Sequence, residues 1–579
     1  MPETFPPGLV LAAGAAFLPF FPRPVRRWVA VLAPALAWVA LSRLPSGEAW
    51  TADFLGYRIV WLDVDRLGWL FALVFLWIAL LGGLYGWHRE RLGEVFFSLL
   101  YAAGGVSAVL CGDLLSLLVS WEVMAVSSAF LVFSRARPSA WAAGFRYLLV
   151  HAAAGGFLLV GVLAHVLETG STELAVFSPA STGGAFLLLS FCINAAVPPL
   201  HAWLPDAYPE GTVSGSVFLS ALTTKTAVYC LLRCFPGSEL LVWAGAVMAL
   251  YGVVFAVLEN DTRRLLSYHI VSQVGYMVCG VGLGTPLGLN GAAAHAFCHI
   301  LYKGLLFMGA GALLYRTGRE RLTELGGLFG AMPLTFLLYM VGAFSISGVP
   351  LFNGFVSKSM VVAAAAEEHR AAIVLLLQAA SVGTFLSVGL KLPYFAWFGP
   401  RRLETPPREA PRSMLLAMGV AAGLCIGLGL DPEWLYERLP FPPVHYHPYT
   451  APHVFEALLL LGATALAFES LRGRLAPKDT VTLDTDVFYR IPARWLAERV
   501  SPALEAASRA VGEILARLGS AVSEAVRNPA LSAARIAGID PGRLPAFDPE
   551  RPRMPLGVSA AWLLVLFGIL GAWLLGLSL

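Results

Sequence analysis

The chain has 579 residues, of which 58% are hydrophobic and only 13% are charged, and its formal net charge is +3. Soluble domains carry about 25% charged residues, so this composition excludes an ordinary soluble protein and indicates a polytopic membrane protein. So small a net charge gives no indication of nucleic-acid binding. The seven cysteines lie in apolar stretches without a CxxC pair, so we expect buried thiols and no disulfide framework.

Apolar stretches long enough to cross a bilayer recur along the chain. No Lys or Arg precedes the first of them, so we expect no cleavable signal peptide and a first helix that stays as an anchor. We predict an all-α polytopic membrane protein with about 16 transmembrane helices, at residues 7–21, 28–42, 66–87, 93–111, 113–133, 141–167, 184–203, 212–235, 240–258, 263–284, 289–315, 331–366 (broken), 371–398, 412–430, 453–471 and 555–578.

Arginines mark alternate loops between these spans. They follow the first, third, fifth, ninth, eleventh and thirteenth spans, whereas the loop after the sixth carries only Glu168 and Glu173. Positively charged loops stay on the cytoplasmic side, so the odd-numbered loops are predicted to be cytoplasmic. We therefore expect a multi-pass protein of the cell (inner) membrane with both termini extracytoplasmic.

An internal repeat is visible in two stretches with Pro-Leu in mid-span, where a helix should break. Asn194-AAVPPLHAWLP resembles Ser345-ISGVPLFNGFV, and one span later Lys225-TAVY resembles Lys391-LPY. Duplicated units with discontinuous helices are a common transporter design, with the ion site near the breaks. The offset is five spans, and an odd offset gives the two copies opposite orientations. We therefore predict two inverted five-helix repeats.

The C-terminal part differs, because residues 476–553 hold most of the late charge and no span. Apolar residues form one stripe of a helix predicted at 501–527, and charged residues at i,i+4 spacing support it on another face. At 1.5 Å per residue this helix would reach about 40 Å. We expect it to lie along the cytoplasmic membrane surface, with a solvent-exposed spacer as the alternative. The stripe consists of Leu504, Val511, Leu515, Leu518 and Val522, and the charged face of Glu505, Arg509, Glu513 and Arg517.

These observations divide the chain into six parts. They are N-terminal peripheral helices (1–92), the first repeat (93–239), the second repeat (240–398), two further transmembrane helices (399–475), the lateral amphipathic segment (476–553) and a final transmembrane helix (554–579).

Three ionisable residues spaced four apart stack on one face of the span at 289–315: His295, His299 and Lys303. Such groups are costly at membrane depth and usually face a hydrated interior where they relay ions or protons. A zinc or haem site is the rival interpretation, since His residues at i,i+4 can bind metal. A third ligand would have to come from elsewhere, and Lys303 would repel a cation, so we expect no metal and no cofactor.

Other ionisable residues lie inside predicted spans. Glu122 is deep in the fifth span, where burial favours its protonated form, so it could take up and release protons near neutral pH. Buried lysines can likewise switch between neutral and charged forms. A structural role is the alternative for each of these residues, and relay and core roles are equally open for the two further histidines. The lysines are Lys225, Lys303, Lys358 and Lys391, and the histidines are His151 and His269.

Four stretches together resemble a known family. They are Pro198-PLHAWLPDAYPEGTVSGSVFLSALTTKTAVYCLLR, Leu258-ENDTRRLLSYHIVSQVGYM, His295-AFCHILYKGLLF and Gly348-VPLFNGFVSKSM. They are similar to the antiporter-like subunits shared by Mrp-type Na+/H+ antiporters, above all their D subunit, and the membrane arm of respiratory complex I. The resemblance covers about residues 60–400. A long lateral helix followed by a last span resembles the largest such subunit of complex I.

The resemblance implies a core of two inverted five-helix units with a hydrated axis of charged residues. Carried over residue by residue, the proton relay is Glu122, Lys225, His295, His299, Lys303 and Lys358, and the residues themselves add Lys391. The family usually places a lysine seven residues before the His of its PLH motif, which is His201 here. That position is Asn194, which cannot carry a proton's charge. Either Lys225 replaces the missing partner of Glu122, or this subunit moves ions differently from its relatives. His151, His269 and Asn194 are accessory candidates.

Three classes of function remain open. The first is a transport subunit of a heteromeric membrane complex that moves protons along the relay and couples them, through partner subunits, to Na+ or another ion. The second is the proton channel of a redox-driven complex, of the complex I or membrane-bound hydrogenase type. The third is a scaffold subunit that has lost conduction, which Asn194 keeps open. We expect a transporter subunit rather than a catalyst, because the chain has no cysteine cluster or nucleotide-binding loop.

Overall fold

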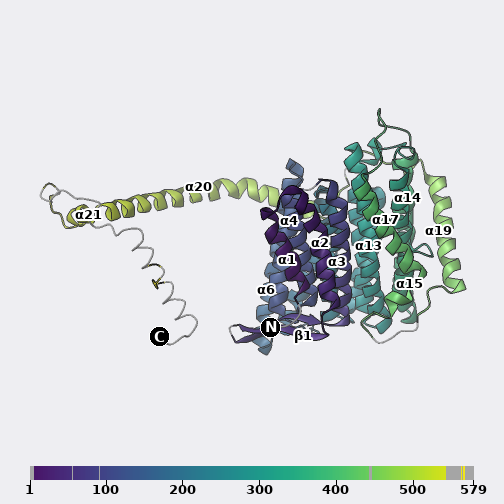
Figure 1. Ribbon diagram of the computed structural model, residues 1–579, viewed down its shortest axis with the longest axis horizontal. Helices are drawn as coiled ribbons and strands as arrows, with labels where there is room; N and C mark the ends of the chain where they lie inside the picture. Colours follow the sequence, from purple (N-terminus) through teal and green to yellow (C-terminus); the bar gives the residue numbers. More distant parts are fainter. Residues whose placement is uncertain are drawn as a thin grey trace. The chain divides into compact units, whose positions relative to one another are not determined.

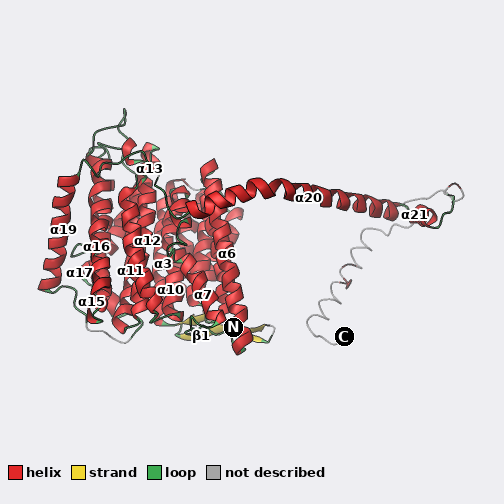
Figure 2. Ribbon diagram, turned by 180° about the vertical axis from the view of Figure 1, so that it is seen from behind, coloured by secondary structure: helices red, strands yellow, loops and turns green. Residues whose placement is uncertain are grey.

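Helices make up nearly all of the regular structure in the computed structural model (Figures 1 and 2). The structure describes residues 5–540 except 55, 90, 442–445 and 481, and beyond them residues 542, 563, 565 and 566. Two compact units are formed, Met1–Asp484 and Thr485–Leu579.

The first unit contains a bundle of helices and one β-hairpin. Its elements are α1 (Pro7–Phe17), α2 (Arg23–Ser42), β1 (Gly47–Phe54), β2 (Tyr57–Val64), α3 (Arg66–Gly86), α4 (Leu92–Leu110), α5 (Leu114–Phe133), α6 (Pro138–Thr169), α7 (Thr182–Asn194), α8 (Trp203–Ala207), the 3₁₀ turn η3 (Tyr208–Glu210), α9 (Gly215–Ala221), α10 (Thr223–Cys234), α11 (Glu239–Leu258), α12 (Thr262–Leu283), α13 (Pro286–Thr317), α14 (Pro333–Ser347), α15 (Asn353–Glu367), α16 (Ala371–Thr384), the π-helical turns η5 (Phe385–Lys391) and η6 (Tyr394–Phe398), α17 (Arg412–Leu430), α18 (Glu433–Tyr436) and α19 (Ala451–Leu471).

Eleven helices of the described part are long and apolar enough, by length and composition, to cross a membrane, and three shorter apolar helices accompany them. Each predicted span from residue 7 to residue 471 coincides with a helix or a pair of helices. The count of sixteen stays a prediction, and the predicted final span at 554–579 lies almost entirely outside the described residues.

The hairpin corrects the all-α prediction. β1 and β2 pair antiparallel from Gly47 opposite Val64 to Phe54 opposite Tyr57. Gly56, with a φ of +82°, supplies the left-handed conformation of the turn. The backbone N–H of Val60 donates to the carboxylate of Asp113 over 2.8 Å, which fastens the hairpin to the connection between α4 and α5. Alternation along this stretch is the strand signal that the search for long apolar runs passed over.

Both predicted helix breaks are present. α7 ends at Asn194, and the non-helical Ala195–Ala202 stretch precedes the short α8. α14 ends at Ser347, and α15 begins at Asn353 after the Gly348-Val-Pro-Leu stretch. Gly348 has a φ of +74°, which ends α14 in a left-handed cap.

Close packing of α11 on α12 depends on small residues. A Cβ on Gly252 would lie only 2.5 Å from the backbone nitrogen of Ser272, and one on Gly275 would lie 2.5 Å from the backbone nitrogen of Ala249. Contacts of this kind let helix backbones approach closely in membrane proteins. The core is deepest around α9, α10 and α13, because the residues of Gly215–Cys234 are all buried and 94% of those tested in α13 are buried.

The second unit contains the predicted amphipathic helix. α20 (Val487–Arg527) begins 14 residues before the predicted start at residue 501 and contains Pro492 and Pro502, and α21 (Pro529–Ile536) follows it. Val511, Leu515, Leu518 and Val522 are all exposed along α20. The helix is therefore confirmed, whereas its placement along the membrane stays a prediction.

Candidate functional site

Lys225 lies beside a third helix break, which the sequence analysis did not predict. The span at 212–235 is divided at Leu222 into α9 and α10, although no Pro or Gly stands at the division. The ammonium group of Lys225 is completely buried and donates to the carbonyl of Ser220 over 2.6 Å and to Oγ1 of Thr224 over 2.9 Å. The break thus supplies the oxygen atoms that satisfy a buried cation.

The polar ladder of α13 lies in the centre of the first unit. His295, His299 and Lys303 are completely buried. Nδ1 of His295 lies 3.0 Å from Oγ of Ser357 on α15. Both ring nitrogens of His299 and Nζ of Lys303 have no hydrogen-bond partner among the described residues. Buried polar atoms without partners are rare, so bound water or a mobile proton is the expected explanation.

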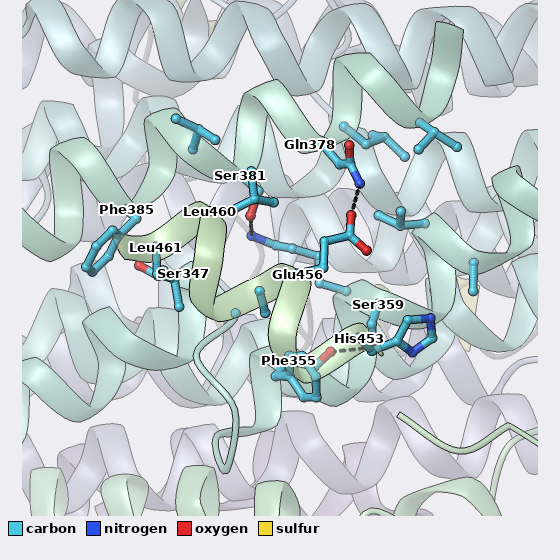
Figure 3. Close-up of a pocket in the computed structure, with 18 of the residues that line it drawn as sticks. Ser347, Phe355, Ser359, Gln378, Ser381, Phe385, His453, Glu456, Leu460 and Leu461 are labelled. Atoms are coloured by element: carbon cyan, nitrogen blue, oxygen red, sulfur yellow. Dashed lines mark hydrogen bonds between the residues drawn. The ribbon is translucent and has the colours of Figure 1, made fainter. Parts of the chain in front are cut away.

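Lys358 occupies the second predicted break. Its Nζ donates to the carbonyl of Ile346 over 2.8 Å and lies 5.0 Å from the centre of the Tyr276 ring. A cavity of about 330 Å³ between α15, α16 and α19 reaches Lys358 (Figure 3). Gln378 and Glu456 are hydrogen-bonded to each other at its wall. The cavity could hold about ten waters at ~30 Å³ each.

Lys391 ends the π-helical turn η5, a rare geometry that is frequent at functional sites. Its Nζ is 3.0 Å from the carbonyl oxygen of Glu259, at the C-terminal end of α11. On the same turn, Oγ of Ser387 lies 2.6 Å from Nε2 of the buried His269. The hydroxyl groups of Ser357 and Ser387 were missed by a search for ionisable residues.

Most of the predicted relay residues are brought together. His299 lies within electrostatic range of Lys225, Lys303 and Lys358, and His269 within range of Lys303 and Lys358. Lys391 interacts with Glu259. A connected series of buried cationic and imidazole groups therefore runs from the first repeat into the second.

Glu122 stands apart from this series. It is half-buried on α5, and its Oε1 lies 1.9 Å from the position that a Cβ on Gly155 of α6 would occupy. Gly155 therefore provides the space for the carboxylate. No ion pair joins Glu122 to Lys225 among the described residues, and Lys225 donates to Ser220 and Thr224 instead. Direct pairing of Glu122 with Lys225, one of the two alternatives for the missing lysine, is therefore not present.

The accessory candidates Asn194 and His151 lie near each other, on α7 and α6. Nδ2 of Asn194 donates to the carbonyl of Ser190 over 3.0 Å. Oδ1 of Asn194 and Nε2 of His151 are buried without a hydrogen-bond partner among the described residues. His151 is otherwise enclosed by the rings of Tyr147 and Trp203, with centroids 4.1 and 4.6 Å away.

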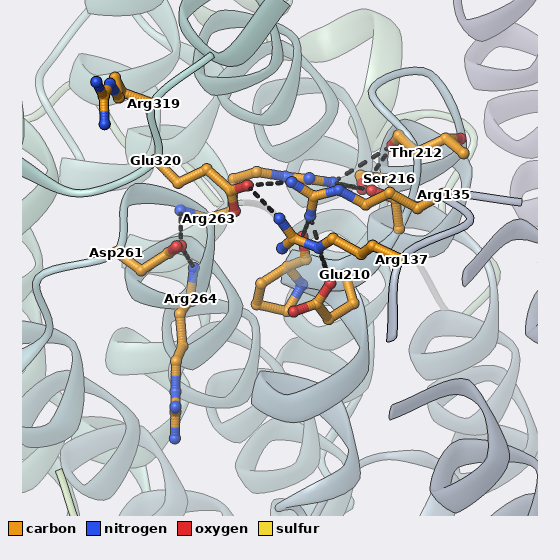
Figure 4. A network of polar contacts seen from close by, with 12 residues as sticks. Arg135, Arg137, Glu210, Thr212, Ser216, Asp261, Arg263, Arg264, Arg319 and Glu320 are labelled. Carbon is orange, nitrogen blue, oxygen red and sulfur yellow. Dashed lines mark hydrogen bonds and ion pairs between the residues drawn. The ribbon is translucent and has the colours of Figure 1, made fainter. Parts of the chain in front are cut away.

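A network of ion pairs lies in the arginine-rich loops (Figure 4). Nε of Arg137 is 2.7 Å from Glu210, and Nη1 of Arg137 is 3.1 Å from Glu320. Arg135 also contacts Glu320. Burial acts to raise the pKa of Glu320, but the charges of Arg135, Arg263 and Arg137 outweigh it and hold the pKa below its usual range.

A polar cavity of about 720 Å³ adjoins this network. Its walls include Glu210, Glu259, Asp261 and Glu320 together with Asp479 and Thr482 from the connection that follows α19. Burial, followed by the nearby charge of Glu320, raises the pKa of Asp261 to about 6. The cavity therefore joins the arginine-rich loops to Glu259 and thus to Lys391. Among the described residues no three His, Cys, Asp or Glu side chains gather closely enough to hold a metal ion.

Comparisons with known proteins agree with this geometry. A family model described as "NADH:quinone oxidoreductase/Mrp antiporter, TM" matches residues 111–387, which include the ladder and both predicted breaks. The N subunit of the NADH-quinone oxidoreductase of Desulforudis audaxviator is 34% identical over 57% of this chain and 74% of its own length. The D subunit of the Na(+)/H(+) antiporter of Alkalihalophilus pseudofirmus is 30% identical over 60% of this chain and 75% of its own length.

A solved structure extends the likeness beyond the family segment. A chain of the membrane-bound sulfane sulfur reductase, an archaeal respiratory membrane complex, superposes with a TM-score of 0.70 at 22% identity. The match covers 98% of this chain and 99% of that chain, and at this identity it shows the fold. The helices, their breaks and the two relatives lead to one conclusion: this chain is a multi-pass membrane protein that belongs to the NADH:quinone oxidoreductase/Mrp antiporter family of antiporter-like subunits.

Proposed function

We propose that this protein moves protons along the relay of Glu122, Lys225, His295, His299, Lys303, Lys358 and Lys391 within a heteromeric complex of the cell membrane. Partner subunits couple this movement to Na+ or another ion. The observation that carries the proposal is the continuous series of buried ionisable groups from Lys225 to Lys391, several of which have unsatisfied nitrogen atoms.

The electrostatics of the series support transfer rather than storage of protons. Two unit charges about 10 Å apart repel each other by about 1.7 kcal/mol at an effective dielectric constant of about 20. A proton that reaches one lysine therefore disfavours protonation of the next, and charge can pass along the series in steps. The cavity beside Lys358 and the cavity beside Glu259 give the second repeat two polar connections toward the surface of the unit.

Proton flux through the purified complex in proteoliposomes tests the proposal, with and without Na+. Glu122→Gln and Lys303→Met keep the shapes of their side chains, and each should reduce flux by about a hundredfold, because a positioned proton-transfer group typically contributes that much. Glu168→Gln is the matched control, since Glu168 is exposed near the end of α6. Wild-type flux in both relay variants would favour a scaffold that has lost conduction.

A redox-driven proton channel is the second candidate. The relative from an NADH-quinone oxidoreductase supports it as strongly as the relative from a Na(+)/H(+) antiporter supports ion exchange. In sealed membrane vesicles, a Na+ gradient should drive proton movement under the first function. A respiratory electron donor should drive it under the second, and loss of either response in Lys303→Met would assign that response to this chain.

A further inference from the structure

The connection between α19 and α20 is held against the second repeat before it reaches the first. Oδ1 of Asp479 accepts a hydrogen bond from Nδ2 of Asn260 over 2.9 Å and lies 3.4 Å from Nη1 of Arg321. Thr482 interacts with Glu259, which in turn interacts with Lys391. This connection therefore reaches the surroundings of a proposed relay residue, although the sequence analysis grouped it with the lateral segment.

Asp484, at the end of the first unit, is buried against the first helix break. Its Oδ2 lies 3.1 Å from Nε2 of His201 and accepts a hydrogen bond from the hydroxyl of Tyr268 over 2.6 Å. The hydroxyl of Tyr251 donates to Oδ1. His201 belongs to the non-helical stretch between α7 and α8, whereas Tyr251 and Tyr268 belong to α11 and α12. One carboxylate thus joins the break of the first repeat to two helices of the second.

The charge of Asp484 is retained by these contacts. Burial acts to raise the pKa of its carboxyl, but the hydrogen bond and charge of His201, with the hydroxyls of Tyr251 and Tyr268, outweigh it and hold the pKa well below the ordinary value. A buried carboxylate satisfied by three donors is costly to move, because displacement would leave charge without partners.

His201 depends on this contact. The side chain is completely buried, and its Nδ1 has no hydrogen-bond partner among the described residues, so Asp484 supplies the ring's hydrogen bond. The Tyr251 ring packs edge-on against it with centroids 4.7 Å apart. His201 stands seven residues after Asn194, across the break.

We infer that Asp484 is a positioning residue that fixes His201 and the break between α7 and α8, and so couples the relay of the first repeat to that of the second. The inference rests on the proposed function for its effect on transport. It assigns a role to a segment outside the matched family region, which ends at residue 387. Asp484 itself carries no transferred proton in this scheme.

The test uses the assembled complex with Asp484→Asn, which keeps the size and one oxygen acceptor but removes the charge. Asp479→Asn is the matched control, because Asp479 lies on the same connection with a side chain that is 64% exposed. Backbone hydrogen exchange of residues 195–202 reports the position of the break, and proton flux in proteoliposomes reports transport. We expect severalfold faster exchange in this stretch and a flux loss of about a hundredfold in Asp484→Asn, with neither change in the control.

A double-mutant cycle with His201→Gln distinguishes positioning from an independent effect. If Asp484 acts through His201, the double variant should transport no worse than the weaker single variant. Losses that multiply would overturn the inference, as would wild-type exchange or wild-type flux in Asp484→Asn. If that variant does not assemble, Tyr268→Phe removes one donor to the carboxylate and should give the same two changes in milder form.

The two proposals fail separately. Normal behaviour of Asp484→Asn beside an inactive Glu122→Gln complex would overturn only the positioning role. Wild-type flux in Glu122→Gln and Lys303→Met would overturn the proposed relay, and unchanged exchange at residues 195–202 in Asp484→Asn would overturn the positioning role on its own.

Discussion

Replacing Gly155 by alanine isolates the position of the Glu122 carboxylate. The added Cβ would lie 1.9 Å from Oε1, whereas a contact below 3.0 Å forces one of the atoms to shift. The oxygen must therefore move by at least about 1 Å, and because it ends a flexible side chain the cost in stability should stay near 1 kcal/mol. A misplacement of about 1 Å can reduce a positioned reaction by about a hundredfold.

Gly156→Ala is the control for this change. Gly156 is the next residue of α6, and a Cβ there meets nothing within 4 Å. Both variants should keep the melting temperature of the complex close to that of the wild type, since Gly→Ala within a helix stabilises by roughly 0.5–1 kcal/mol. Only Gly155→Ala should lose proton flux in proteoliposomes. Equal flux in the two variants would refute the assignment of Glu122 to the relay.

Three further predictions concern other parts of the chain. Val511→Glu with Leu518→Glu should dissociate the complex on native gels, because each lost apolar contact costs about 1.5–3 kcal/mol if the exposed stripe of α20 is buried by partners; Arg517→Glu on the exposed charged face should not, and an intact complex would identify α20 as a spacer. The stability that Asp484 contributes should be present above its unfolded pKa of about 3.9 and lost as the pH falls below it, since its folded pKa is depressed; acidification should speed exchange around residues 195–202 in the wild type, and an equal response in Asp484→Asn would contradict this cause. Gly252→Ala should lower the stability of the complex by about 1–3 kcal/mol in thermal unfolding, because its Cβ would meet the backbone of Ser272, and an unchanged melting temperature would show that α11 and α12 can separate.

Sequence patterns predicted the helices and the ladder because apolar length and i,i+4 spacing are local signals. Pro-Leu in mid-span likewise predicted the breaks near His201 and Gly348. The break at Leu222 carries no such signal, since the stretch from Gly215 to Cys234 holds neither Pro nor internal Gly. It is compensated by a tertiary and local arrangement in which Lys225 reaches the Ser220 carbonyl.

Contacts between distant segments were beyond the reach of these patterns. Asp484 and His201 are 283 residues apart, and nothing in the composition of 476–484 distinguishes it from the lateral segment that follows. The start of α20 was also missed, because Pro492 and Pro502 predict interruption whereas the helix continues through both. The positions of the buried lysines could be predicted from sequence, but the oxygen atoms that satisfy them could not.

The donor set along the relay also determines which ions it suits. From Lys225 through the α13 ladder to Lys391 the side chains offer ammonium and imidazole nitrogen, while in the described part of the chain the carboxylates Glu122 and Glu259 stand at either end. Hard cations require several oxygen ligands to replace their hydration shells, and a lysine nearby repels them. The axis is therefore selective for protons over alkali cations, and any Na+ exchanged by the complex must follow a separate path lined by oxygen atoms.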